Sequence, residues 1–230
     1  LRKAALINNS ANVGGAIAVE GAANAPNSGL GLWNVLVAAN SAEQGGALWI
    51  SDRSQVGVLN STLTNNSANE GGAIYAIGST NLINSTISHN SASISASSIR
   101  SSSTGSPVTV FNSIIGNDLT FPVTSLSGGF NSNGNNLITD ARTSTGFGNG
   151  TKADQVSDNN AIDAKLGSLS DNGGPTDTRD LLAGSPAIDA GNSCTLTGCT
   201  SFPPPNNNIY LPDDQQYRFR WSVGAAVDIG

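Results

Sequence analysis

Polar and apolar positions recur along the first part of the chain in a fixed order. An Asn-Ser-Ala triplet is followed, after two further residues, by a Gly-Gly pair, and the glycines are followed by alanine and a large aliphatic residue. This pattern occupies residues 9–17, 40–48 and 66–74, and a fourth copy that begins at Asn90 lacks the glycines. The copies begin 31, 26 and 24 residues apart, which indicates units of one shape joined by loops of different length.

A second element recurs once per unit. Short runs rich in β-branched and aliphatic residues, of the kind typical of strands, occupy residues 33–36, 59–63, 83–87 and 111–115. No segment shows the 3.6-residue period of a helix, and the pattern fits neither leucine-rich repeats nor propeller blades. We therefore predict an all-β fold, a right-handed parallel β-helix with coils of 24–31 residues over 1–136. Residues 137–230 are expected to form terminal coils, a loop-rich cap and a lateral cover.

Stacking of equivalent residues about 4.8 Å apart explains which residue type stands at each position. The asparagines are expected to form an inward ladder in which each side-chain amide hydrogen-bonds the next. The glycines are expected to allow a positive φ or a close backbone approach. Small alanines leave room in a thin interior that the aliphatic residues fill. The predicted structural positions are Asn9, Asn40, Asn66 and Asn90 for the amides and Gly15, Gly46 and Gly72 for the glycines.

Five Asn-X-Ser/Thr triplets could accept N-linked glycans, and they begin at Asn8, Asn60, Asn65, Asn84 and Asn149. The repeat itself generates most of these triplets. We therefore interpret them as structural asparagines, with glycans expected only in a eukaryotic secretory host.

Composition and charge narrow the class of protein further. Only 37% of the residues are hydrophobic and 11% are charged, which suits a repetitive β architecture built from small side chains. The formal charge of -6 argues against binding to nucleic acid or to an anionic membrane. No apolar run is long enough to span a bilayer, and the first residues lack the apolar stretch of a signal peptide. Because the sequence contains no methionine, we interpret it as a processed chain or a fragment.

The two cysteines, Cys194 and Cys199, are close in sequence, which predicts a small disulfide loop formed in an oxidising compartment. So short a loop contributes only about 2 kcal/mol by the loop-entropy model, so we expect it to shape a local turn. A zinc site would need two more ligands, and the single histidine, His89, lies far away in the sequence. His89 is interpreted as a structural or exposed residue at a turn.

The C-terminal third has fewer strand-like runs and more loop signals. Residues 166–176 read Leu-Gly-Ser-Leu-Ser-Asp-Asn-Gly-Gly-Pro-Thr, and residues 181–191 read Leu-Leu-Ala-Gly-Ser-Pro-Ala-Ile-Asp-Ala-Gly. This segment resembles the end region of bacterial β-helix proteins with choice-of-anchor Q domains, and the repeats are similar to those of polymorphic outer-membrane proteins. The resemblance covers nearly the whole chain and implies a secreted or surface-anchored right-handed β-helix without assigned chemistry. The Asp-Gln-Arg-Gly and Asp-Ile-Gly patterns that usually follow in that family are matched loosely by residues 214–218 and 228–230.

An enzyme is the main alternative, because many β-helices are polysaccharide lyases, hydrolases or epimerases. Such sites need carboxylates that converge on one face, usually with a basic residue that neutralises a uronate. In residues 1–136 the acids are few and scattered: Glu20, Glu43, Asp52, Glu70 and Asp118. We interpret Glu43 and Glu70 as a solvated edge and Asp52 with Arg53 as a surface pair. No catalytic, cofactor-binding or metal-binding residue is therefore expected.

Two further hypotheses concern the tail and the threonines. Calcium is the one ion that the tail could hold, although the Asp-X-Asp-X-Asp-Gly spacing of a calcium loop is missing; the aspartates are Asp177, Asp180, Asp189, Asp213 and Asp214. Asp189 is instead expected to cap a turn with its side-chain oxygen. Ice binding would need a larger face than the two rungs formed by Thr62, Thr64, Thr86 and Ser88.

The sequence thus favours a non-catalytic extracellular or cell-surface structural protein, such as a fibre or sheath subunit or an adhesin stalk. The alternative is a carbohydrate-active β-helix enzyme. Because residues 5–11 begin in the second half of a coil and residues 227–230 break off in a strand-like run, we expect axial continuation. The continuation is either into further repeats of a longer chain or into the next subunit of a fibre. Surface glycans are the other partner considered.

Overall fold

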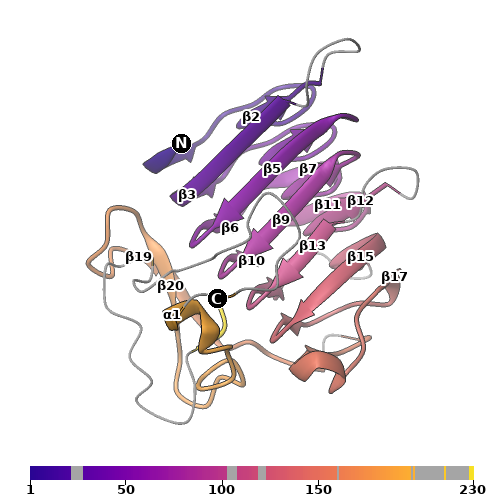
Figure 1. Cartoon of the computed structure of the whole chain (residues 1–230). Helices are drawn as coiled ribbons and strands as arrows, with labels where there is room; N and C mark the ends of the chain where they lie inside the picture. Colours follow the sequence, from indigo (N-terminus) through magenta and orange to yellow (C-terminus); the bar gives the residue numbers. More distant parts are fainter. Residues whose placement is uncertain are drawn as a thin grey trace.

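The computed structural model describes residues 1–21, 28–102, 108–118, 123–159, 161–197, 199, 215 and 228–230. Their parallel strands stack into a right-handed β-helix of about four turns (Figure 1), so the predicted fold class is confirmed. Sixteen of the strands belong to one continuous sheet that wraps round the interior.

Three parallel stacks of strands form the sides of this helix. β3 (Ser28–Ala38) and β15 (Leu126–Gly134) each belong to two stacks and so join all three into one sheet. The stack that we call the covered face contains, besides the end of β3, β1 (Arg2–Ile7), β6 (Thr62–Thr64), β10 (Thr86–Ser88), β14 (Ile114–Gly116), β16 (Leu137–Ile138) and β18 (Gln155–Val156). The open face contains the start of β3, β5 (Ser54–Leu59), β9 (Ser79–Ile83), β13 (Val108–Phe111) and the end of β15. The third face contains β2 (Ile17–Val19), β4 (Leu48–Ile50), β8 (Ile74–Ala76), β12 (Ile99–Ser101), the start of β15 and β17 (Thr143–Thr145).

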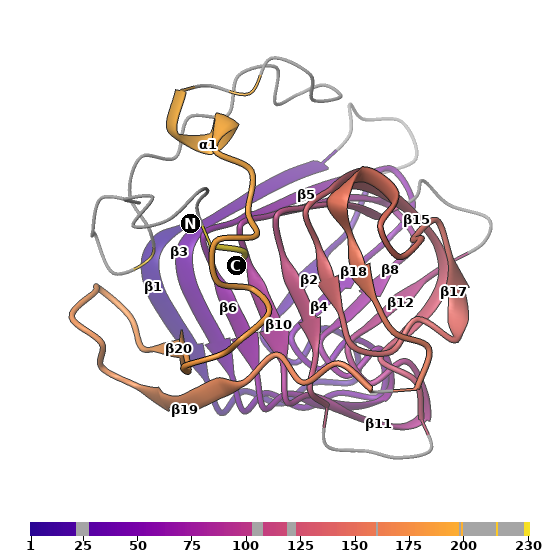
Figure 2. The ribbon, with the colours of Figure 1, turned by 90° about the horizontal axis from the view of Figure 1, so that it is seen from below.

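The remaining elements lie outside this sheet. β7 (Ser67–Glu70) and β11 (Ser91–Ser95) form a short parallel pair. β19 (Leu166–Ser170) and β20 (Thr178–Leu181) form an antiparallel pair beside the covered face (Figure 2). Two single turns complete the described structure, η1 (Thr151–Ala153) and α1 (Cys194–Thr197).

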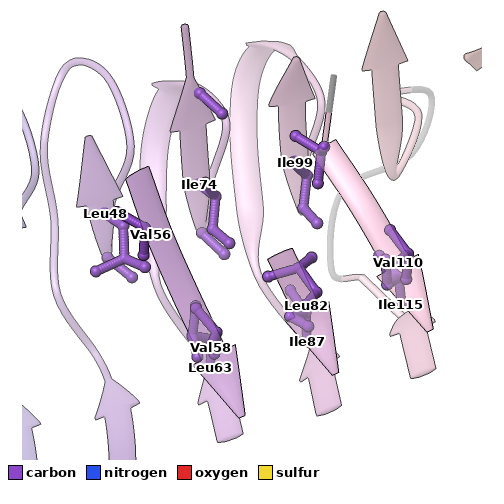
Figure 3. Packing of buried hydrophobic residues seen from close by; sticks show 14 of the residues in the cluster. Leu48, Val56, Val58, Leu63, Ile74, Leu82, Ile87, Ile99, Val110 and Ile115 are labelled. Atoms are coloured by element: carbon purple, nitrogen blue, oxygen red, sulfur yellow. The ribbon is translucent and has the colours of Figure 1, made fainter. Parts of the chain in front are cut away.

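The interior is made of aliphatic columns, because inward residues of successive coils occupy the same place. On the third face Leu48, Ile74 and Ile99 are in register and fully buried. Val58 with Leu82, and Leu63 with Ile87, continue the packing on the other two faces (Figure 3). Burial of one such side chain contributes about 1.5–3 kcal/mol. The stacked columns therefore provide an apolar core although only 37% of the residues are hydrophobic.

Each coil turns at corners, where a residue with positive φ precedes a residue whose side chain enters a polar ladder. The first corner column has φ between 46° and 54° and consists of Asn34, Asn60, Asn84, Asn112 and Asn135. The second column has φ between 51° and 59° and consists of Asn8, Ala39, Asn65, His89 and Asn117. Asparagine tolerates this left-handed region better than most residues with a side chain, which explains why it dominates both columns.

The corners correct one interpretation made from the sequence. Residues 59–63 and 83–87 are not single strands, because each contains a corner: Asn60 and Ser61 separate β5 from β6, and Asn84 and Ser85 separate β9 from β10. Apolar residues on both sides of the turn gave the run its strand-like appearance.

Candidate functional site

The predicted asparagines form a hydrogen-bonded ladder along the second corner. The backbone N–H of each donates to the side-chain Oδ1 of the asparagine one coil further on, at 2.8 Å from Asn9 to Asn40, 3.0 Å from Asn40 to Asn66 and 3.0 Å from Asn66 to Asn90. The Nδ2 of Asn9, Asn40 and Asn66 also donates to the next Oδ1. The Nδ2 of the three later asparagines donates back to a carbonyl of the preceding coil. The three later asparagines are buried, whereas Asn9 is exposed at the end of the ladder.

A second ladder, which sequence reasoning missed, follows the first corner. The N–H of Val35 donates to Ser61 Oγ at 3.1 Å, that of Ser61 to Ser85 Oγ at 3.3 Å, and that of Ser85 to Ser113 Oγ at 3.1 Å. The N–H of Ser113 then donates to Asn136 Oδ1 at 3.1 Å. The Asn-Ser pairs that recur at 60–61, 84–85 and 112–113 were the sequence signal of this ladder.

Both ladders end on an aspartate carboxylate. Asn90 donates its N–H to Asp118, and Asn136 donates its N–H to Asp154 at 2.9 Å. Burial raises the pKa of Asp118 to about 6, against the opposing effect of hydrogen bonds from serine hydroxyls, chiefly that of Ser98. Burial likewise raises the pKa of Asp154. The backbone N–H of Asp154 donates to Thr151 O within its own turn instead of to a further coil, so the second ladder terminates there.

The two glycines of each repeat are required for different structural reasons: the first has a positive φ, and the second lies in close contact with the next coil. Gly14, Gly45 and Gly71 have φ between 58° and 64°. The following glycines lie where coils touch: a Cβ on Gly46 would be 2.2 Å from the carbonyl oxygen of Gly72. Gly15 and Gly72 have equally short approaches to the next coil. In the fourth copy Ala96 takes the positive φ, at 56°.

Cys194 and Cys199 form a disulfide, with their Cα atoms 5.0 Å apart. The bridge packs against a row of apolar residues that project from the open face, namely Trp33, Leu59, Ile83 and Phe111. The bridge therefore also contributes to an apolar cluster on the open face, and its weight in holding the fold stays a prediction.

The threonine rungs considered for ice binding are buried. Thr62 donates from Oγ1 to Gln215 Oε1 at 2.8 Å, and Arg179 of β20 donates from Nε to Thr64 Oγ1 at 2.9 Å. Thr62, Thr64 and Ser88 are each at most 2% exposed. The C-terminal segment therefore acts as the lateral cover of this face, and the face offers no threonine array to a ligand.

Asp189 does not have the side-chain role expected for it. It is exposed, has a positive φ of 56°, and donates its own backbone N–H to the carboxylate of Asp228 at 2.7 Å. Asp228 therefore caps this turn from a distant part of the chain, a contact that local spacing cannot reveal. Asp213 and Asp214 lie outside the described residues.

The acids considered for catalysis are scattered or paired. Glu70 forms an ion pair with Arg100 at 2.7 Å, while Glu43 is exposed and out of register with it, because Gln44 pairs with Glu70. Asp52 and Arg53 are a largely exposed pair at 3.9 Å. Within the described part of the chain, no group of three or more His, Cys, Asp or Glu is placed to hold a metal ion.

The Asn-X-Ser/Thr triplets divide into two groups. Asn60 and Asn84 are buried corner residues, so a glycan cannot be attached to them in the folded protein. Asn8, Asn65 and Asn149 are exposed, although Asn65 Oδ1 also accepts a hydrogen bond from Arg179 at 3.3 Å.

The open face carries a polar hollow at the end remote from β1. Register aligns Asn81, Thr109 and Asn131 in one outward row, and the row leads into a cavity of about 210 Å³. The cavity is lined by Thr109, Phe130, Asn131, Ser132, Asn133, Gly146 and Lys152. None of these lining residues is an acid, so general acid and base groups of a glycosidase are missing from the hollow itself.

The fold defines the class of this protein as a parallel β-solenoid with a lateral cover. No protein-family model, curated protein or solved structure matches the chain significantly. The resemblance to choice-of-anchor Q and polymorphic outer-membrane proteins therefore stays a prediction. Among the residues described, no helix has the length and apolar character needed to cross a membrane.

Proposed function

We propose that this protein is a non-catalytic structural solenoid of the cell surface or extracellular space, such as a fibre or sheath subunit or an adhesin stalk. The observation that supports this best is how the aspartates with raised pKa are used. Asp118 accepts hydrogen bonds from Asn90 and Ser98, and Asp154 accepts them from Asn136 and Ser132. Carboxylates of this kind are natural candidates for acid and base catalysis, but here their oxygens terminate structural ladders.

The proposal includes axial contact through the N-terminal coil. In every later coil the ladder Oδ1 accepts an N–H from the coil before it, whereas no donor among the described residues reaches Asn9 Oδ1. β1 pairs with β3 and with no other described strand, and Leu1 and Ile7 are 50% and 45% exposed. An open strand edge of this kind is a template for another strand. A further coil of the same type, from a longer chain or from a second subunit, would satisfy the edge, the ladder and the apolar residues together.

At the opposite end the second ladder stops, although the last strands of two stacks, β17 and β18, each pair with one described strand only. The backbone N–H of Asp154 turns back to Thr151 O at 3.0 Å instead of pointing to a further coil. Axial continuation at this end would therefore have to use the edges of β17 and β18, and it stays part of the proposal.

Sedimentation velocity and negative-stain microscopy over a range of protein concentrations test self-association. We expect larger species at higher concentration, weakened by Ile7→Lys, which places a charge on the N-terminal coil. Ile94→Lys is the matched control, because Ile94 is 67% exposed on β11 and away from that coil. A monomer at every concentration in the wild type and both variants would contradict assembly into a fibre.

The enzymatic alternative is tested separately. Purified protein incubated with pectin, alginate and neutral glucans is expected to release neither reducing ends nor unsaturated sugars. Release that is lost in Glu70→Gln or Asp52→Asn, with the fold retained by circular dichroism, would overturn the non-catalytic proposal.

A further inference from the structure

The hollow on the open face contains donors that the protein itself leaves free. Lys152 Nζ donates to the carbonyl oxygen of Ser132 at 2.6 Å, and an ammonium group has three donors. Asn133 Nδ2 is buried without an acceptor. Buried polar groups are normally satisfied, so the Asn133 amide points to a ligand with oxygen acceptors, and the exposed ammonium of Lys152 on the same lining has further donors for it.

Lys152 is the one charged residue among those that line the hollow. Lys152 is exposed and forms no ion pair with a described residue, and the carboxylate closest in sequence, Asp154, is buried. Asp154 Oδ1 accepts hydrogen bonds from the N–H and Nδ2 of Asn136, and its other oxygen accepts one from Ser132. Asp154 therefore directs its hydrogen bonds into the ladder. The positive charge of Lys152 acts on Asp154 and opposes the rise of its pKa, and the ammonium keeps donors beyond its bond to Ser132 that an external anion can accept.

The shape of the hollow is fixed by the backbone. Gly146 has a φ of 103°, and a Cβ there would be 1.8 Å from the carbonyl oxygen of Phe130, so a side chain cannot fill this part of the lining. At about 210 Å³ the cavity is smaller than the roughly 300–1,000 Å³ of sites for drug-sized ligands. It therefore suits a single ring rather than an extended molecule.

We propose that this hollow binds one acidic sugar residue, a polyhydroxylated ring that carries a carboxylate. Lys152 Nζ takes the carboxylate, because a charge-assisted hydrogen bond is about twice as strong as a neutral one. The amides of Asn131 and Asn133 and the hydroxyl of Thr109 take the ring hydroxyls, for which they offer both donors and acceptors. The same site would let a surface solenoid attach to acidic polysaccharide without cleaving it.

Binding of methyl glucuronide, with methyl glucoside as the neutral counterpart, tests the proposal by titration calorimetry and by amide shifts in ¹⁵N NMR spectra. We expect the uronide to bind about tenfold or more tightly than the glucoside, since loss of one charge-assisted hydrogen bond has an effect of this size. The amides of Thr109, Asn131 and Asn133 should shift on binding.

Lys152→Gln should remove the preference for the uronide, and Asn131→Ala should weaken both sugars, since Asn131 is exposed and its loss leaves the fold intact. Lys165→Gln is the matched control: Lys165 is also exposed and also has a positive φ, 48° against 53° for Lys152, but does not line the hollow. Thermal unfolding checks that each variant is folded.

Equal binding of the two sugars, or a preference that survives Lys152→Gln, would overturn the proposal. Inorganic sulfate that competes as well as the uronide would identify a general anion site and would also overturn it. Neither outcome affects the structural role, because sedimentation of the wild type and of Ile7→Lys measures that role independently.

Discussion

Asn90 donates its backbone N–H to Oδ1 of Asp118 at 3.1 Å, so the asparagine ladder ends on a carboxylate that has a raised pKa. In each earlier coil the same position holds a neutral amide. Replacement of the amide by an acid at the last step makes the stability of the ladder depend on pH.

Asp118→Asn should change how stability depends on pH. The pKa of Asp118 is about 6 in the folded protein against 3.8 in the unfolded chain, so the folded state binds the extra proton between these values. The contribution of Asp118 to folding stability is therefore largest below about pH 4 and falls as pH rises to about 6, by up to about 3 kcal/mol. Asparagine keeps an acceptor for Asn90 and does not titrate.

Urea unfolding of the wild type and Asp118→Asn at pH 4, 5, 6 and 7.5 measures this effect. The difference in unfolding free energy should move in favour of the variant as pH rises. A constant difference over the whole series would show that the carboxylate is not confined as the structure has it.

Asn66→Ala should destabilise the protein by about 3 kcal/mol or more. The change removes the acceptor of the Asn40 N–H, one of the two acceptors of Asn40 Nδ2, and the Nδ2 donor to the carbonyl of Val37; each buried unsatisfied group costs about 1–3 kcal/mol. Asn9→Ala, at the exposed end of the same ladder, should cost less than about 1 kcal/mol. Chemical denaturation of both variants gives the comparison, and equal losses would contradict the buried ladder.

Gly46→Ala should cost several kcal/mol, because the new Cβ would meet the carbonyl oxygen of Gly72 at 2.2 Å and the coils would have to separate. Gly31→Ala is the control, because nothing lies within 4 Å of a Cβ there. We expect the control to change the melting temperature little, or to raise it slightly through the entropy of the unfolded chain. Similar melting temperatures for the two variants would contradict the close contact.

Replacement of Cys194 and Cys199 by serine should lower stability by more than the roughly 2 kcal/mol expected from loop closure alone. The excess arises because the bridge packs on Ile83 and Phe111, which the serines would cover less well. Urea unfolding of the double variant and of the reduced wild type gives the size of the loss. Mass spectrometry without reductant should find no free thiol in the untreated protein.

The stacked part of the fold could be predicted from the sequence because each coil has the same local structural requirements. Asn40 and Gly46 stand in a fixed order since every coil needs a polar corner and a close approach, and repetition made that order visible. The second ladder was hidden because its members change from Ser113 to Asn136. The chemistry at Asp118 and Asp154 was hidden because a terminating residue breaks the repeat.

A lateral cover was expected from the sequence, but the contacts that it makes, and the hollow, could not be predicted. Thr62 is 153 residues from Gln215, and Lys152 approaches Ser132 only through a turn whose φ is 53°. Both arrangements depend on where the chain leaves the coils, which no periodic signal encodes. Asp189 illustrates the same limit, because its partner Asp228 comes from the far end of the chain.

The lateral cover also determines how this solenoid should unfold. Contacts between neighbouring coils join residues 24 to 31 positions apart in the asparagine ladder, and a stack held only by such contacts can lose its coils one at a time from an end. Arg179 bonds to Thr64, Asn192 bonds to Asn112, and Asn135 bonds to Ala190, so the cover is fastened to three different coils. Opening any one of these coils requires release of a segment that also holds its neighbours. The cover thus couples the coils, so that they should unfold together as one cooperative unit. Because the contacts of the cover join residues more than 50 positions apart, we expect it to dock last during folding.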